Sequence, residues 1–225
     1  MLRKVIVFGV ASLFSANVMA TGAGDWLMRV GLGHVNTDTS SNDLVVGGDV
    51  LPDARISVGN NTRPIVTLTY MATDHIGFDL LAAWPFDHDI DGAGILEGAG
   101  KLGDTKHLPP TFSVQYHMMP GAPFRPYAGI GLNYTNFFSS GTTPALEEAL
   151  GGPSSLSISD SWGVALQVGA DFDITDQLFM NLDIRWIQIE ADASIRTQTD
   201  AGEVRSRIKA DIDPFVFSAS VGFRF

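Results

Sequence analysis

The sequence predicts an all-β fold, namely an eight-stranded antiparallel up-and-down transmembrane β-barrel. Three observations lead to this prediction. Apolar and polar residues alternate with a period of two along most of the chain, the apolar phase carries no charge, and the connections between alternating segments are short and long by turns. Alternation with a period of two is typical of a strand with two different faces, whereas a helix would need spacings of three and four.

The composition narrows the class of protein. The chain has 225 residues, of which 45% are hydrophobic and 17% charged. Soluble domains carry about 25% charged residues, so the low value indicates a surface that only partly faces water. The net charge of −11 argues against a nucleic-acid-binding protein, because such domains are usually basic. The absence of cysteine excludes disulfides, thiol catalysis and thiolate metal sites.

The first twenty residues predict a signal peptide. Arg3 and Lys4 form a basic start, and "VIVFGVASLF" is an apolar core too short to span a bilayer. Val18 and Ala20 stand at the small-residue positions of a cleavage site. We therefore expect residues 1–20 to direct bacterial export and residues 21–225 to form one outer-membrane barrel.

Eight alternating segments make up the rest of the chain. They are predicted at about residues 25–36, 64–73, 75–87, 109–118, 125–138, 160–174, 177–190 and 213–225. Their lengths of about ten to fourteen residues exceed the five or six of an average soluble strand. A tilted transmembrane strand needs about nine to eleven residues, so the lengths favour a membrane barrel.

Each segment is predicted to be a strand because every second residue in it is apolar. In the first four these positions are Trp26, Met28, Val30 and Leu32, then Val66, Leu68 and Tyr70, then Ile76, Phe78, Leu80, Ala82, Trp84 and Phe86, then Phe112, Val114, Tyr116 and Met118. In the last four they are Pro126 to Tyr134 and Trp162 to Phe172 on even numbers, then Met180, Leu182, Ile184 and Trp186, then Phe215 to Phe225 on odd numbers. Aromatic residues lie near many segment ends, as the interface girdles of membrane barrels do.

Charges avoid this apolar phase. At 17% charged residues, about six charges would be expected by chance on its 38 positions, and it has none. The opposite phase carries Arg29, Asp79, Asp171, Asp183, Arg185 and Arg224. One lipid-facing Arg or Lys near the midplane costs about 2–4 kcal/mol, so the pattern favours hydrocarbon around the sheet. A β-sandwich, the main alternative, would have Lys, Glu and Thr on its polar phase instead of Gly, Ala, Ser and Asn.

The connections alternate in length. The short ones contain "TDH", "PGAPF" and "TDQ", whereas the long ones cover about residues 37–63, 88–108, 139–159 and 191–212. Short periplasmic turns and long outer loops are the pattern of outer-membrane barrels. We expect the four long links to be solvated loops and both ends of the barrel to lie on the periplasmic side.

The last strand has two expected roles. It must pair with the first strand to close the barrel. It also resembles the C-terminal signal that outer-membrane assembly machinery reads, which would consist of Phe217, Val221, Phe223 and Phe225.

Motifs for catalysis or metal binding are weak. The stretch "DHDIDG" at residues 87–92 matches half of an EF-hand loop, but position twelve is Gly98 instead of Glu. The five histidines show no metal-ligand spacing, and no nucleophile elbow or phosphate-binding loop is present in the sequence. We therefore expect no cofactor, no resident metal and no enzyme activity. A hydrolase with Ser, His and an acid gathered at the barrel rim is the least favoured alternative.

The chain resembles the OmpW family of small outer-membrane proteins. The resemblance lies in "TYMATDHIGFDLLAAWPF", "HLPPT", "FRPYAGIGLNYTNFF", "DSWGVALQVGADFDI" and "DPFVFSASVGFRF", and it extends over residues 22–225 except the long loops. It implies a narrow, largely hydrophobic interior that admits small hydrophobic molecules and releases them sideways into the membrane. Pro109 and Pro110 in "HLPPT" cannot donate ladder hydrogen bonds, so they are candidates for the lateral exit, or they simply begin the strand.

The resemblance also assigns residues to the lumen. Leu81 matches a Leu that narrows the passage, whereas Arg185 stands where the family has a Trp. Arg185 would polarise or close the lumen by pairing with Asp183 or Asp79, and Arg29 is a further lining residue.

Two functions follow as hypotheses. The first is a porin-like barrel for passive uptake of small, mainly hydrophobic molecules. The second is a closed structural barrel whose loops serve as an adhesion, phage or toxin receptor surface. In both, the partners are membrane lipid, lipopolysaccharide and the assembly machinery, and the barrel is expected to be a monomer.

Overall fold

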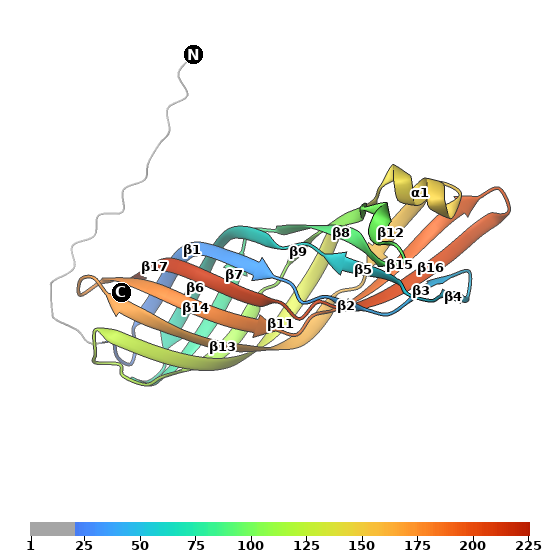
Figure 1. The fold of residues 1–225 in the computed structure, drawn as a ribbon. Helices are drawn as coiled ribbons and strands as arrows, with labels where there is room; N and C mark the ends of the chain where they lie inside the picture. The colour runs from blue at the N-terminus through green and yellow to red at the C-terminus, as the bar shows by residue number, and fades with distance from the viewer. Residues whose placement is uncertain (1–20) are drawn as a thin grey trace, which may run out of the picture.

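The computed structural model describes residues 21–225, so the predicted signal peptide lies outside the described residues. Eight antiparallel strands form a closed barrel (Figure 1), in the order β10-β7-β6-β1-β17-β14-β13-β11, and β10 pairs with β11 to close the ring. The strands are β1 (Trp26–Asn36), β6 (Asn61–Met71), β7 (Ile76–Ala83), β10 (Thr111–His117), β11 (Phe124–Thr142), β13 (Ser161–Asp173), β14 (Leu178–Ile187) and β17 (Phe215–Arg224). The predicted fold class is confirmed.

The first and last strands of the barrel meet at a continuous seam. Strands β1 and β17 pair from Leu27 opposite Arg224 to Asn36 opposite Phe215. Beyond that ladder, the backbone N–H of Trp26 donates to the carbonyl of Phe225 at 2.8 Å, and the reverse hydrogen bond is 3.0 Å long. The final aromatic residue is therefore held by backbone hydrogen bonds.

The two faces of the ring differ as the alternation predicts. Outward side chains are apolar and exposed, as are Leu32, Leu132 and Val168 at 56–62% of their surface. Inward charged side chains such as Arg29, Asp79 and Asp171 are almost completely buried. An apolar band around a polar interior matches a membrane barrel.

The four long links differ from the prediction, because they continue the wall as strands beyond the ring (Figure 1). These strands are β2 (Ser40–Ser41), β3 (Leu44–Val46), β4 (Asp49–Leu51), β5 (Ala54–Val58), β8 (Phe86–Gly94), β9 (Lys101–Leu108), β12 (Ser154–Ile158), β15 (Glu190–Thr199) and β16 (Gly202–Asp211). Strands β9, β8 and β5 extend the sheet from β11, and β12-β15-β16-β3-β4 form a second sheet. We call this part the extracellular extension.

Polarity is inverted in the extracellular extension. Along β16, Ser206, Ile208 and Ala210 point inward and are buried, while Arg207 and Lys209 point outward. The links therefore keep a period of two, but water lies outside them instead of lipid. The prediction that these four links are loops was therefore wrong, because they form strands.

The acidic stretch at residues 87–92 shows the same inversion. Asp87 and Asp89 lie on the outer side of β8, where they form ion pairs with Lys106 at 3.8 Å and Lys101 at 2.7 Å. Phe86 is 2% exposed, so its prediction as a lipid-facing residue was wrong. The reason is that β7 ends at Ala83 and the chain resumes as β8 with the phase reversed.

Two short helices also lie in the links, η1 (Glu97–Ala99) and α1 (Pro144–Leu150). Helix α1 is capped by the hydroxyl of Thr143, and it ends at Gly151, whose φ of 86° is the left-handed conformation that favours glycine. Neither helix in residues 21–225 has the length and apolar character needed to cross a membrane.

Candidate functional site

The lower half of the lumen, toward the short turns, contains a buried network of charges. Arg29 of β1 donates from Nε and Nη2 to the two carboxylate oxygens of Asp171 on β13, at 3.1 and 2.9 Å. Asn181 of β14 donates to the same carboxylate at 2.8 Å. Such a bidentate pair is a strong, geometrically specific interaction. It joins opposite walls of the barrel across its interior.

A second chain of hydrogen bonds connects Arg29 to Arg185. Arg29 donates to the Thr69 hydroxyl at 2.7 Å, and that hydroxyl donates to Asp79 at 2.7 Å. Arg185 donates to the other oxygen of Asp79 at 3.2 Å and also to Gln167. Its Nε lies 3.8 Å from Asp183. Arg185 therefore contacts both of the carboxylates that the sequence had suggested for it.

Aromatic and apolar side chains fill the remaining space at this level. The Arg29 guanidinium carbon lies 5.4 Å from the ring centre of Tyr127 and 5.5 Å from that of Phe179. Leu27 and Met71 pack with Phe179 and are fully buried. The cavity between Arg29, Asp79 and Arg185 has a volume of only about 10 Å³. The lower lumen is therefore closed to any solute larger than about one water molecule.

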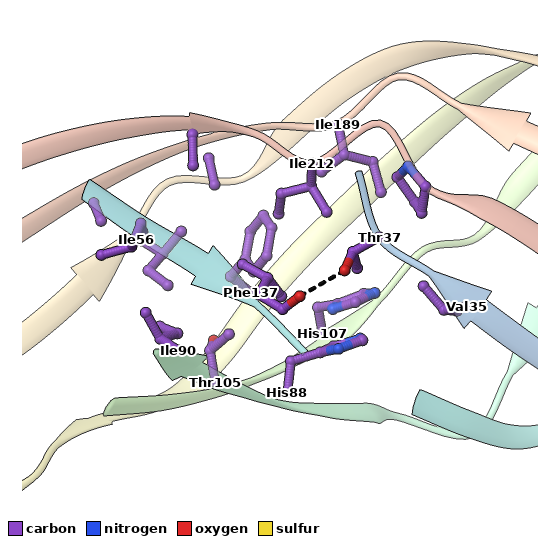
Figure 2. Close-up of a pocket in the computed structure, with 16 residues that line it drawn as sticks. Val35, Thr37, Ile56, His88, Ile90, Thr105, His107, Phe137, Ile189 and Ile212 are labelled. Atoms are coloured by element: carbon purple, nitrogen blue, oxygen red, sulfur yellow. Dashed lines mark hydrogen bonds between the residues drawn. The ribbon is translucent and has the colours of Figure 1, made fainter. Parts of the chain in front are cut away.

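The upper half of the lumen is apolar. Leu81 is 5% exposed and belongs to a cluster with Ile65, Phe86, Ile187 and Val216. A cavity of about 30 Å³, which we call the upper cavity, adjoins this cluster, because Val35, Phe137, Ile189 and Ile212 belong to the cluster and also line the cavity. Its lining (Figure 2) consists mainly of aliphatic side chains, among them Val35, Ile56, Val58, Ile90, Ile158, Ile189 and Ile212, with Phe137. A further apolar cavity of about 50 Å³ lies within the extracellular extension, between Leu102, Leu156 and Ile208.

Two histidines interrupt this apolar lining. His88 of β8 and His107 of β9 stack with ring centres 4.9 Å apart and planes 4° apart, as Figure 2 shows. Both belong to the extracellular extension and are at most 6% exposed. Burial lowers the pKa of His107 to about 3, and burial also lowers the pKa of His88. Both rings are therefore neutral at physiological pH.

The barrel wall is interrupted beside the upper cavity. The β7–β10 ladder ends at Leu81 opposite Thr111, and the β8–β9 ladder begins at Phe86 opposite His107. Within the described chain, no ladder pair joins residues 82–85 to residues 108–110. On their other sides the pairing continues, since Trp84 N–H donates to Pro64 and Tyr134 N–H donates to Pro110. We call this region the wall interruption.

Proline explains the wall interruption. Pro85 stands on one side of it, with Pro109 and Pro110 on the other, and none of the three has an N–H to donate. Inward side chains donate to the carbonyls of Pro109 and Pro110, of which that of Pro110 also accepts the backbone N–H of Tyr134. Asn133 donates to Pro109 at 3.2 Å and to Pro110 at 3.3 Å, and the Thr111 hydroxyl donates to Pro109 at 3.1 Å. Both carbonyls therefore have hydrogen-bond donors although the ladder is missing here.

The site residues predicted from the sequence fall into three places. Arg29, Asp79, Asp183 and Arg185 meet in the lower lumen, and Leu81 lies just above them. Pro109 and Pro110 lie at the wall interruption. The four residues of the expected assembly signal, Phe217, Val221, Phe223 and Phe225, lie on β17 or directly after it and face outward, 37–52% exposed, on the opposite side of the wall from the lumen network.

Sequence reasoning missed three residues of the site. Pro85 was read as part of a continuous strand, although "WP" directly after "LLAA" signals an end to pairing. His88 and His107 were assigned no role in the lumen, because the five histidines show no metal-ligand spacing. The signal that would have found them is the inverted alternation of their strands, which places both rings inward.

The fold and lumen define the class of protein, which is a transmembrane β-barrel of the bacterial outer membrane. The chain belongs to the OmpW family, whose model matches residues 22–225. It is 39% identical to outer membrane protein W of Vibrio cholerae over 217 residues, covering 96% of this chain and 95% of that protein. It is 37% identical to outer membrane protein W of Escherichia coli, covering 98% of each.

A solved structure is also similar. The outer membrane protein OprG from Pseudomonas aeruginosa is 35% identical, with a TM-score of 0.85, and the match covers 92% of this chain and 98% of OprG. These relatives are outer-membrane proteins, and this chain is likewise an outer-membrane barrel.

Proposed function

We propose that this barrel takes up small, mainly hydrophobic molecules passively and releases them sideways into the outer membrane. The observation that supports this most is the order of features along the lumen. The apolar upper cavity lies above a closed, ion-paired floor and beside the wall interruption. A solute that enters from outside meets apolar walls first, then a polar barrier, with an unpaired stretch of wall next to it.

The two ways out of the upper cavity differ in cost. Passage toward the periplasm would separate Arg29 from Asp171 or Arg185 from Asp79. Leaving one partner of a buried ion pair unpaired costs about 3–5 kcal/mol. Passage through the wall breaks no ladder hydrogen bonds between residues 82–85 and 108–110. Leu81 is the proposed constriction, and Arg185 is the proposed closure of the axial route.

The name of one relative supports an apolar solute. The protein PahQ of Pseudomonas aeruginosa, 26% identical over 200 residues, is named for a dibenzothiophene metabolism operon. Dibenzothiophene is an apolar aromatic molecule, which fits an apolar upper cavity better than a polar channel.

A reversible lock on the wall tests this route. The chain has no cysteine, so Ala82→Cys with Pro110→Cys introduces a single pair. Both positions face outward, and continuing the register from Leu81 and Thr111 places them opposite each other. Oxidation should slow the entry of N-phenyl-1-naphthylamine, an apolar dye that fluoresces in lipid, into cells producing the protein. Reduction of the same sample should restore the rate.

The matched control is a lock where pairing is already complete. Leu68→Cys with Leu80→Cys joins register partners on β6 and β7 that also face outward. This lock should leave dye entry unchanged. If the locked wall admits dye at the unlocked rate, lateral release is wrong. If all variants match cells without the protein, uptake itself is wrong.

The second candidate, a closed structural barrel with a receptor surface, is favoured by one observation. The lower lumen is filled by side chains, as small barrels often are. Comparing Leu81→Arg and Arg185→Trp with wild type in the same dye assay separates it from uptake, because a structural barrel would show no difference.

The proposed partners follow from the surface. Lipid covers the apolar band, and the exposed cations Arg207 and Lys209 of the extracellular extension suit the phosphates of lipopolysaccharide. The outward aromatics of β17 would be read by the assembly machinery. The barrel is proposed to act as a monomer.

A further inference from the structure

Helix α1 covers the second apolar cavity, the one of about 50 Å³ in the extracellular extension, which we call the distal cavity. Leu146 of α1 is part of its lining, together with residues of β9, β12, β15 and β16. The other residues around Leu146 on the helix, Ala145, Glu148 and Ala149, are exposed, and α1 lies on the outside of the extension (Figure 1). One side of the helix therefore faces the distal cavity and the other faces water.

The distal cavity lies between two sheets, and their two edges are closed in different ways. Strands β9, β8 and β5 belong to one sheet and β12-β15-β16-β3-β4 form the other. At the edge where β5 lies beside β2, side chains tie the sheets together. The Ser41 hydroxyl accepts from the N–H of Ile56 at 3.0 Å and donates to its carbonyl at 3.3 Å, and the Thr39 hydroxyl accepts from the N–H of Val58 at 3.2 Å.

At the other edge, α1 closes the gap. It connects the end of β11, where Thr142 pairs with Gly103 of β9, to the start of β12 at Ser154. Within residues 21–225, residues 144–150 form no hydrogen bond or ion pair with any residue outside 142–152. Apolar contact through Leu146 is therefore what seats the helix on the cavity.

The ends of α1, in contrast, are fixed. Before the helix, the N–H of Thr143 donates to the carbonyl of Leu102 at 2.9 Å. After the helix, the N–H of Gln198 donates to the carbonyl of Pro153 at 3.0 Å. Two glycines, at positions 151 and 152, lie between the helix and this second attachment, and small residues at the end of an element are typical of hinges.

The distal cavity adjoins the upper cavity. Ile56, Ile90 and Ala193 line both of them. A dry cavity that binds benzene has a volume of about 150 Å³, so cavities of about 50 and 30 Å³ do not hold such a solute as they stand. A solute must therefore push side chains apart, and at α1 this breaks no hydrogen bond between the helix and the sheets.

We propose that solutes enter the lumen beneath helix α1, which swings outward on its fixed ends when Leu146 leaves the distal cavity. This inference rests on the proposed uptake function and locates its entrance. The entrance suits small uncharged apolar molecules, because aliphatic side chains line the distal cavity. Entry at the opposite edge would break the hydrogen bonds of Ser41 and Thr39.

A cysteine reporter measures this opening. The chain has no cysteine, so Ile208→Cys places a single thiol at a position that lines the distal cavity and is 5% exposed. N-ethylmaleimide, a small uncharged reagent, is added to the full chain in lipid nanodiscs, and labelling is followed by mass spectrometry. Adding Leu146→Ala should speed labelling about fivefold to tenfold, the factor that half-burying a leucine side chain provides.

Three comparisons assign the effect to α1. Leu44→Ala is the matched control, because it removes the same atoms from the distal cavity on β3 and leaves α1 intact; labelling should stay near the rate of the reporter alone. Ser41→Ala loosens the opposite edge and should also leave the rate unchanged. A second reporter, Ile212→Cys in the upper cavity, should be labelled faster with Leu146→Ala, because the two cavities adjoin.

The possible failures are distinguishable. Unchanged labelling with Leu146→Ala, or an equal increase with Leu44→Ala, overturns α1 as the cover. An increase with Ser41→Ala alone places the entrance at the opposite edge and also overturns the proposal. An increase at Ile208→Cys without one at Ile212→Cys overturns the route between the cavities. Fast labelling with no dye entry leaves the cover standing and shows that uptake is wrong.

Discussion

The lower and upper halves of the lumen are built from the same wall, but they differ in what their side chains do. In the lower half, charged groups pair across the interior and leave a volume of about 10 Å³. In the upper half, mainly aliphatic groups leave cavities of about 30 and 50 Å³. Directional pairs hold opposite strands at fixed distances, whereas apolar side chains only exclude water. The comparison teaches that paired charges close the lower half, whereas the upper half keeps small apolar cavities that hold a solute only if their side chains move apart.

The largest expected effect is on the charge network. Asp171→Ala removes the carboxylate that binds Arg29 from two of its nitrogens and lies 4.0 Å from Arg125. Two buried cations then lose their nearest common partner. We expect a loss of about 3–5 kcal/mol in the free energy of unfolding, measured by denaturant titration in detergent micelles. A loss below about 1 kcal/mol would mean that the lower half is not held by this pair.

The second effect concerns the boundary between the halves. Leu81→Arg places a charge in the apolar cluster that Leu81 forms with Ile65 and Val216, at the cavity of the lower lumen that these three residues line. We expect dye entry to fall to the level of cells without the protein, because the apolar space is lost. Leu81→Met keeps volume and polarity, should cost less than about 1.5 kcal/mol, and should retain entry. Unchanged entry in Leu81→Arg would remove Leu81 from the route.

The third effect is a pH dependence in the upper half. Burial lowers the pKa of His107 to about 3, so the folded protein binds its proton less readily than the unfolded chain, whose His titrates near 6.5. Stability from this group is therefore complete above about pH 6.5 and falls as pH drops toward 3, by about 1.4 kcal/mol per pH unit. His88 acts in the same direction: burial lowers its pKa and Arg63 adds a smaller lowering, while the hydrogen bond to the Gly59 carbonyl, Asp87 and Asp89 oppose that shift.

Amide hydrogen exchange resolves this prediction by region. Strands β8 and β9 should lose protection as pH falls from 6.5 to 4.5, after correction for the intrinsic rate, while β13 and β14 keep theirs. In His107→Phe the change in β8 and β9 should shrink. An equal loss of protection in both halves would place the sensitive group elsewhere.

The smallest effect is on the outer surface of the extracellular extension. Lys209 and Asp192 lie 3.1 Å apart but are 71% and 54% exposed. Exposed pairs contribute little because water screens them. Lys209→Ala should leave the unfolding midpoint unchanged within error, in direct contrast to Asp171→Ala. A comparable loss in both variants would show that burial does not distinguish the two kinds of ion pair.

The sequence predicted the membrane part of the fold well, because a charged residue on the lipid-facing side of a strand is costly and the alternation is therefore strict. Each of the eight ring strands was expected within a few residues, and the buried charges such as Arg29 and Asp171 were placed on the correct face. The extracellular strands were missed for a physical reason. Outside the membrane, water surrounds the wall, so in β16 the apolar Ile208 faces inward and the charged Lys209 faces outward. The alternation is still present there, but its many polar residues resemble those of a loop.

The site was predictable in its parts but less so in its arrangement. The opposite charges of Arg185 and Asp79 on one phase indicate that they face the lumen, but not that they meet across it, because strand order and register determine such distances. The upper cavity depends on β5, β8, β9 and β15 together. Pairing between residues so far apart in the chain carries no local signal at His88 or His107.

The seam between β1 and β17 has a consequence for how the molecule forms. Every other ladder of the ring joins segments that follow one another in the chain, whereas this ladder joins Leu27 to Arg224, almost 200 residues apart. Contacts of such long range are slow to form. Until they do, the growing sheet presents two open edges that can pair with another chain. Completion of the cylinder is therefore the step at which kinetic competition with aggregation is decided.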